Sequence, residues 1–130
     1  MADYKGNFIL GFNHWERSTI TINAALAALG KLDYGTLINY NGTTYSVVRD
    51  TSDIGLDTVG IVLVQPEGIE VANGEQLDVV CGTVRIDTAA YEAVRLANTN
   101  STLANLSDMV NENASITGNG CIIQLVKVVR

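Results

Sequence analysis

The sequence predicts a mainly β domain with two short helices, a β-rich α+β fold of the small barrel-like or sandwich-like kind. Runs of β-branched and aromatic residues recur along the chain and are separated by glycine-containing turns. The hydrophobic period changes clearly to that of a helix only after residue 87. A length of 130 residues suits a single core. We therefore expect an extended N-terminal arm, residues 1–17, followed by one domain, residues 18–130.

The arm is distinguished by its aromatic side chains, which are half of those in the chain. Two glycines within it disfavour a helix and favour an extended conformation. Aromatic side chains near a terminus either pack on the protein's own core or anchor a partner, and the sequence leaves both options open. We predict that they contact a partner, together with the single histidine: Tyr4, Phe8, Phe12, His14 and Trp15.

The clearest local signal is an Asn-Gly dipeptide, Asn41-Gly42, between two β-rich flanks in residues 36–48. Asn-Gly favours a type I′ turn and therefore predicts a two-residue hairpin. This register would place Tyr40 opposite Thr43 and Ile38 opposite Tyr45.

Four further segments are predicted strands. Residues 18–22 alternate hydroxyl and isoleucine side chains, and residues 59–64 form a continuous apolar run that suits a strand buried on both faces and ends before Pro66. Residues 77–86 follow an Asn-Gly turn at 73–74 and contain Gly82, which we expect at a bulge or close approach. The last strand covers residues 121–129.

Helical periodicity covers residues 89–96, with Asp87 or Thr88 as the N-cap, and residues 103–110, where Leu103, Leu106 and Met109 recur at helical spacing. A segment at 24–29 suits either one or two helical turns or a loop.

The charge distribution argues against nucleic-acid and membrane partners. The net charge is −6, and no basic residue lies between Arg49 and Arg85, an interval with seven acidic residues. Such a stretch repels phosphate groups, so counterion release cannot drive binding there. Charged residues make up only 17% of the chain, below the roughly 25% usual in soluble domains, which favours coverage of part of the surface by a partner. Abundant Thr, Asn and Ser are the alternative explanation.

Residues suited to catalysis are scarce, so we expect no enzyme, metal site or cofactor. His14 is the one histidine, and one histidine cannot build a zinc site alone. No Gly-x-Ser-x-Gly elbow or phosphate-binding Gly-Lys-Ser/Thr loop is present. Cys81 and Cys121 lie in apolar runs and are predicted core residues, and a disulfide between them stays open. The N-terminus lacks a signal-peptide pattern, and no apolar run is long enough for a membrane helix, so we expect synthesis in a cytoplasm.

The order of the glycine-initiated strands resembles the lambda-type bacteriophage head decoration proteins. The segments that carry the resemblance are Gly-Thr-Leu-Ile (35–38), Gly-Ile-Val-Leu-Val (60–64), Gly-Thr-Val (82–84) and the terminal Gly-x-Ile-Ile…Val-Val-Arg (120–130). The resemblance implies a homotrimer that binds the major capsid protein on the outside of an expanded head, stabilises the shell and is part of the virion. It also implies that the N-terminal arm lies against the capsid protein, often completing a sheet with it.

Two other functions remain open. The chain could be another virion subunit of a tail, baseplate or head fibre. It could also be a small carbohydrate- or ligand-binding module that uses Trp15 and exposed tyrosines as a stacking platform.

Overall fold

The structure is a computed structural model that describes residues 8–53, 57–63, 67–98, 101–118 and 121–129; within these ranges the side chains of 12–15, 116 and 118 are not described. It is β-rich, with two short α-helices. The elements are β1 (Ile9–Thr21), α1 (Ala24–Ala27), β2 (Lys31–Leu32), β3 (Leu37–Tyr40), β4 (Tyr45–Val47), η1 (Thr51–Asp53), β5 (Thr58–Ile61), β6 (Ile69–Glu70), β7 (Gln76–Asp87), α2 (Thr88–Ala97), η2 (Ser107–Met109), β8 (Ala114–Gly118) and β9 (Cys121–Val126).

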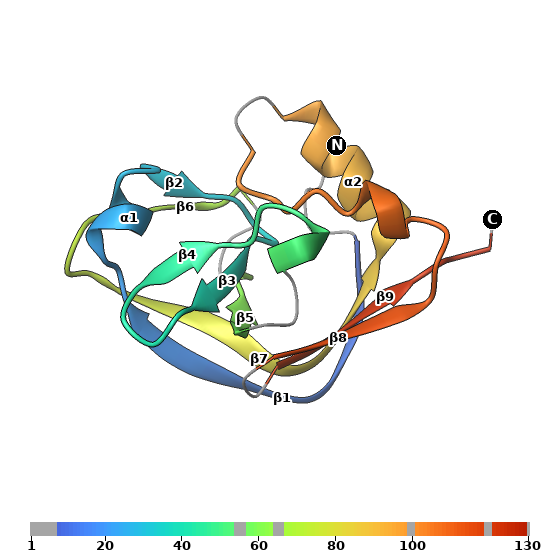
Figure 1. Cartoon of the computed structure of the whole chain (residues 1–130), viewed down its shortest axis with the longest axis horizontal. Coiled ribbons are helices and arrows are strands. Elements are labelled where there is room, and N and C mark those ends of the chain that lie inside the picture. The colour runs from blue at the N-terminus through green and yellow to red at the C-terminus, as the bar shows by residue number, and fades with distance from the viewer. Residues whose placement is uncertain (1–7, 54–56, 64–66, 99–100, 119–120, 130) are drawn as a thin grey trace.

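Most strands belong to one curled sheet, which resembles half of a barrel (Figure 1). Its order is β4-β3-β5-β7-β9-β8, and β1 also pairs with β7. β1 runs antiparallel along almost all of one side of β7. The strands β5 and β9 therefore share the other side of β7. β7 and β9 are parallel, and α2 connects the end of β7 to the segment that leads to β8. The small second sheet consists of β2 and β6.

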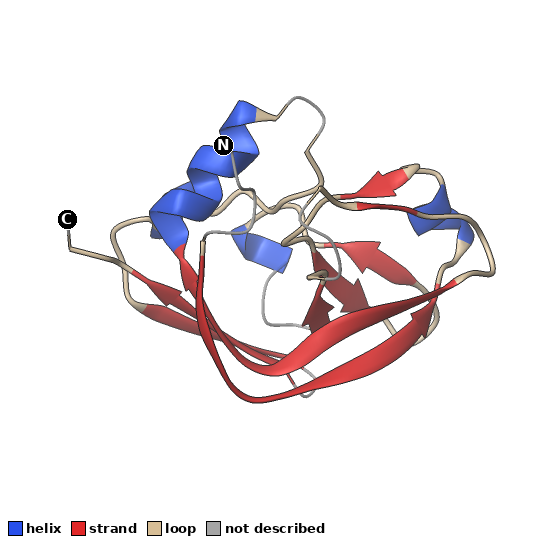
Figure 2. Cartoon of the chain, turned by 180° about the vertical axis from the view of Figure 1, so that it is seen from behind, coloured by secondary structure: helices blue, strands red, loops and turns tan. Residues whose placement is uncertain are grey.

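The buried side chains form two clusters. The first, which we call the α2 core, lies between the curled sheet and α2 and contains Tyr91 of α2 with Val84 and Ile86 of β7. Figure 2 shows α2 across from the two long strands. The second, the α1 core, packs Leu26 of α1 against other residues of the sheet and of β2. β3 contributes to both clusters because its neighbouring residues point to opposite faces of the sheet.

Several predicted elements are confirmed. Ile20 and Ile22 are both buried, as the alternation of residues 18–22 predicts. β5 lies inside the sheet, and Ile61 and the following Val62 are fully buried. The N-cap of α2 is Asp87, whose Oδ1 accepts a hydrogen bond from the Ala90 N–H at 3.3 Å.

The predicted register of the β3–β4 hairpin is wrong by two residues. Tyr40 pairs with Tyr45 and Ile38 with Val47, so the turn centres on Gly42 and the residue after it. The cause is the side chain of Asn41: its Oδ1 accepts hydrogen bonds from the backbone N–H groups of residues 43 and 44, at 2.9 and 2.8 Å. An asparagine in this arrangement starts the turn and does not occupy its first central position.

The helix predicted over residues 103–110 is also wrong, since only the 3₁₀ turn η2 forms there. Several backbone N–H groups of this segment donate to groups outside it instead of to carbonyls four residues earlier. Leu106 N–H donates to Glu92 Oε2 at 2.8 Å, and Ala104 N–H donates to the Tyr91 hydroxyl at 3.3 Å. Glu92 is 4% exposed and is also paired with Arg95 at 2.8 Å. The apolar residues at helical spacing therefore belong to a loop, which hydrogen bonds to α2 hold in place.

Candidate protein-binding edge

β1 is the longest strand and forms an edge of the sheet. Ten of its thirteen residues pair with β7, and in the part of the chain that the structure describes no other strand pairs with it. In Figure 1 it follows the outer rim beside β7. An edge strand presents a row of backbone N–H and C=O groups that can pair with another extended chain.

The two halves of this edge differ in regularity. The N-terminal half contains two register shifts against β7, one between Ile9 and Gly11 and one between Asn13 and Glu16. At the second shift β1 carries one extra residue opposite Gly82, whose φ of 95° is in the left-handed region. The prediction of a bulge at Gly82 is confirmed, although the extra residue belongs to the opposite strand. From Glu16 to Thr21 the register is unbroken, so the second half is a regular strand.

Backbone geometry fixes which groups face outward in this regular half. Ile22, the residue after β1, donates its N–H to Glu75 O at 2.7 Å and therefore faces β7. In an antiparallel pair, successive residues alternate between facing the partner strand and facing away. The N–H and C=O groups of Thr19 and Thr21 consequently point away from β7, toward the open edge.

The side chains at this edge are exposed on both faces of the sheet. Residues 16–19 are all exposed, and the next buried residue is Ile20. Thr19 Oγ1 donates to Asp78 Oδ1 at 2.7 Å, which joins the side chains of β1 and β7 at the surface. We call residues 16–21 the β1 edge. It is a regular, mainly polar strand with exposed side chains on both faces of the sheet, and its outward backbone groups can form hydrogen bonds.

The prediction that Phe8 of the arm contacts a partner is wrong. Its side chain is 0% exposed and belongs to the α2 core, with its ring 4.8 Å from the ring of Tyr91 and 6.0 Å from that of Tyr34. A side chain enclosed in this way is not available to a partner. The physical reason is the space that Gly35 leaves, since a Cβ at Gly35 would lie 2.4 Å from Phe8 Cζ.

The other arm residues are placed only in part. Phe12, His14 and Trp15 have their backbone in β1, whereas their side chains lie outside the described part of the structure, as does all of Tyr4. Their contact with a partner stays a prediction. The predicted division between residues 17 and 18 is not seen, because β1 continues through it.

Metal-binding clusters are not found in the described residues. No group of three His, Cys, Asp or Glu side chains there could hold a metal ion. A pocket of about 460 Å³ lies beside β2 and β6 and is lined by Lys31, residues 67–69 and Glu70. It combines the exposed charges of Lys31, Glu67 and Glu70. In the described residues, no helix is long and apolar enough to span a membrane.

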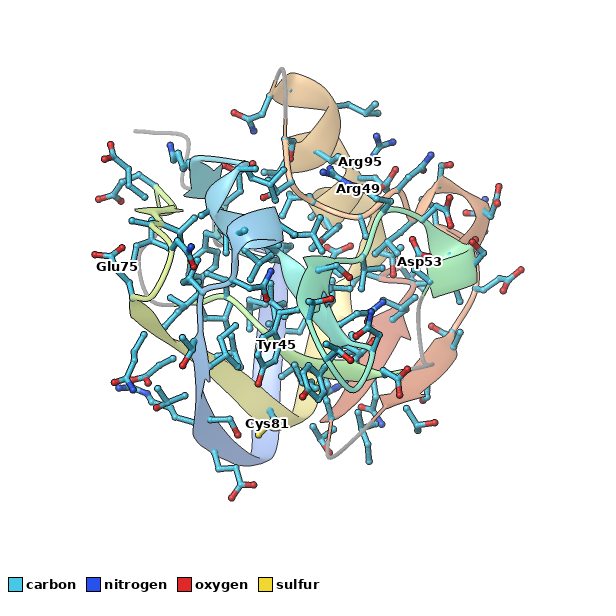
Figure 3. The ribbon with its side chains drawn as sticks, turned by 60° about the vertical axis from the view of Figure 1, so that its left-hand side comes forward. Tyr45, Arg49, Asp53, Glu75, Cys81 and Arg95 are labelled. Atoms are coloured by element: carbon cyan, nitrogen blue, oxygen red, sulfur yellow. The ribbon has the colours of Figure 1, made fainter. Side chains whose placement is uncertain are left out.

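The two cysteines are buried free thiols on neighbouring strands, with Cys121 paired to Gly82 of β7. Burial, with a smaller contribution from Cys81, raises the pKa of Cys121 to about 12, so its thiol is protonated at neutral pH and is a poor nucleophile. Cys81 Sγ lies against β1, 3.5 Å from Glu16 O and 3.6 Å from Ser18 Oγ (Figure 3). Both cysteines fill space in the α2 core, as the sequence predicts.

The β1 edge was not predicted from the sequence, which indicates only a strand with alternating side chains at residues 18–22. Their alternating pattern shows which side chains are buried but not whether a second strand pairs on the outer side.

Comparison with protein-family models, with curated proteins and with solved structures found no match to this chain.

Proposed function

We propose that this chain is a decoration protein of a phage head, which binds the major capsid protein on the outside of the expanded shell as a homotrimer and stabilises that shell. The observation that carries the proposal is the β1 edge, where Thr19 and Thr21 direct backbone hydrogen-bonding groups away from the sheet. An extended segment of a shell subunit would add to this edge as a further strand.

The arrangement of the resemblance segments supports this assignment. Residues 35–38, 60–64, 82–84 and 120–130 contribute to β3, β5, β7 and β9, which are consecutive neighbours in the sheet. Segments far apart in the sequence thus form one continuous surface. The resemblance therefore concerns the central sheet of the domain and not a set of unrelated turns.

Stabilisation of the shell follows from binding alone. A protein that binds the expanded shell and not its precursor stabilises the expanded state by mass action, by about 2.7 kcal/mol per site at a free concentration one hundred times Kd. No reaction is required, in agreement with the scarcity of catalytic groups. A closed trimer would bring three such edges to one site and would raise the effective affinity through multivalency.

The structure changes which residues should be tested. Deletion of residues 1–16 would remove Phe8 from the α2 core and half of β1, so loss of binding in that variant would follow from loss of folding. A substitution at the β1 edge is more informative because these side chains are exposed.

We expect Thr19→Pro to weaken binding to expanded heads that lack this protein by at least about tenfold, which corresponds to about 1.4 kcal/mol. Proline removes the outward N–H, and its ring obstructs an added strand, whereas the pairing with β7 uses the inward groups of neighbouring residues. Thr19→Ala is the matched control. It also loses the hydrogen bond to Asp78 but keeps the N–H, so it should bind like the original chain.

Binding would be measured by co-sedimentation with purified expanded heads, and folding by circular dichroism. Equal binding by the proline and alanine variants would refute the role of the β1 edge. If the original chain bound no heads, and electron microscopy located it on a tail, baseplate or fibre, the capsid assignment would be replaced by that location.

The carbohydrate-binding alternative gains little from the described residues. Tyr34, Tyr40 and Tyr45 are half-buried and Tyr91 is fully buried, so the described tyrosines do not form an exposed stacking platform. Binding of the isolated chain to a glycan array would nevertheless favour this alternative over the capsid assignment.

A further inference from the structure

Two exposed turns contain the same dipeptide in different hydrogen-bonding environments. Asn41-Gly42 lies between β3 and β4, and Asn73-Gly74 precedes β7. Tyr45 and Glu75, labelled in Figure 3, follow these two turns. A third Asn-Gly, at 119–120, lies outside the described residues. All four residues of the first two dipeptides are exposed, so exposure alone does not distinguish them.

At the first turn, the side-chain amide of Asn41 is polarised by its surroundings. Its Oδ1 accepts the backbone N–H groups of Thr43 and Thr44 at 2.9 and 2.8 Å, and the Thr44 hydroxyl lies 3.5 Å away. Among the described residues, the Gly42 N–H has no acceptor. Gly42 is exposed and a Cβ built on it would meet nothing within 4 Å, so solvent reaches this part of the turn.

We propose that Asn41 is a site of spontaneous deamidation, in which this turn promotes attack on the side chain by the next backbone nitrogen. A base from solvent removes the Gly42 N–H proton, and the nitrogen adds to Cγ of Asn41. Negative charge then develops on Oδ1, where the two N–H donors stabilise it in the manner of an oxyanion hole. The bond from Cγ to the amide nitrogen breaks, the nitrogen takes up a proton and leaves as ammonia, and a five-membered succinimide remains.

Water completes the reaction by opening the ring at one of two carbonyl carbons. Opening at Cγ gives aspartate, and opening at the former backbone carbonyl gives isoaspartate. The aspartate product keeps an oxygen acceptor for Thr43 and Thr44, now as charge-assisted bonds. The isoaspartate product adds a carbon to the main chain between Tyr40 and Tyr45, whose rings are 4.6 Å apart, and should disturb this pair.

The second turn lacks a free nucleophile. Gly74 donates its N–H to Ile22 O at 2.8 Å, so deprotonation would place an amide anion directly against a carbonyl oxygen. The turn is also closed by Glu75, whose N–H donates to Ala72 O at 3.1 Å and whose Oε1 accepts the Ala72 N–H at 2.9 Å. Attack by the Gly74 nitrogen requires these bonds to open, so Asn73 should react slowly in the folded chain.

The test compares both sites in one sample. The full chain is incubated in mildly alkaline buffer, digested, and analysed by mass spectrometry for the mass gain and the isoaspartate isomer in the peptides that contain Asn41 and Asn73. We expect Asn41 to react at least about tenfold faster than Asn73. In concentrated urea the two sites should react at similar rates, because the hydrogen bonds that distinguish them are lost.

An Asn41→Asp variant assigns the product. It retains the acceptor for both N–H groups, so it should fold normally and lose the fast reaction, while the slow reaction at Asn73 is unchanged. Equal rates at the two sites in the folded chain would overturn the proposal. So would the absence of product at Asn41 in the folded chain when the same asparagine reacts in urea, because the turn would then protect Asn41 and not activate it.

Discussion

Replacement of Phe8 by alanine should destabilise the domain by about 4 kcal/mol, because Phe8 is a core residue and not a partner anchor. The side chain is 0% exposed and packs in the α2 core against Tyr34 and Tyr91. Phe→Ala substitutions in protein cores cost roughly 3–5 kcal/mol. Relaxation around the cavity should be limited, since the hydroxyl of Tyr91 is fixed by a 2.7 Å hydrogen bond to Gly35 O.

The expected loss is a large share of the roughly 5–15 kcal/mol by which domains are stable. For a chain of this length it corresponds to a fall in Tm of about 10–15 °C. The free energy of unfolding would be measured by guanidinium titration with circular dichroism. Leu10→Ala is the matched control two residues later, in β1. Leu10 is 43% exposed, so its replacement should lower the free energy of unfolding by no more than about 1 kcal/mol. If the two variants were equally stable, Phe8 would not be core, and its assignment as a partner anchor would be restored.

Two further predictions test other parts of the domain. Gly60→Ala should lower the free energy of unfolding by about 1–3 kcal/mol through overpacking, because a Cβ there would lie 2.6 Å from Val79 Cγ2. Gly11→Ala is the control, since a Cβ at Gly11 would meet nothing within 4 Å. Guanidinium titrations should show the loss of stability in the first variant and not in the second. Stability should also fall at high pH, because burial raises the pKa of Cys121 from 9.0 to about 12. The stabilising contribution of the Cys121 thiol is complete below pH about 9, where the thiol is protonated in both the folded and the unfolded chain. This contribution is lost as the pH rises toward about 12. Guanidinium midpoints at neutral pH and at pH about 11 should therefore differ less in Cys121→Ala than in the original chain, and an unchanged difference would contradict this.

Local signals predicted the elements whose cause is local. Asp87 caps α2 because a carboxylate before a helical run can accept an N–H of the first turn. Ile20 and Ile22 are buried because a strand places alternate residues on one face. The Asn-Gly dipeptide at Asn41 correctly located a hairpin, yet its register depended on a side-chain acceptor that the turn statistics do not contain.

Elements that depend on distant residues were not predictable in the same way. Phe8 is buried by Tyr91, 83 residues later in the chain, in space left by Gly35. The segment 103–110 has helical spacing, but Glu92 and Tyr91 accept the N–H groups of Leu106 and Ala104. In both cases the sequence pattern identifies an apolar side chain correctly, and only the tertiary structure decides what covers it.

The proposed division of roles, with stability from Phe8 and attachment through the β1 edge, is the reverse of the one that the composition of this region favours. Aromatic bulk near the start of the chain predicted the binding region there, but Phe8 is enclosed, and the following residues carry two register shifts of the kind that discourage strand addition. The hydroxyl-rich part, which was predicted only as a strand, is the regular and open one. Stability and attachment should therefore separate experimentally. Phe8→Ala should lower stability while the fraction that remains folded still binds, whereas Thr19→Pro should lower binding with little loss of stability beyond that of Thr19→Ala. If a variant at either position lowered stability and the binding of its folded fraction to the same extent, the Phe8 packing and the β1 edge would act as one unit.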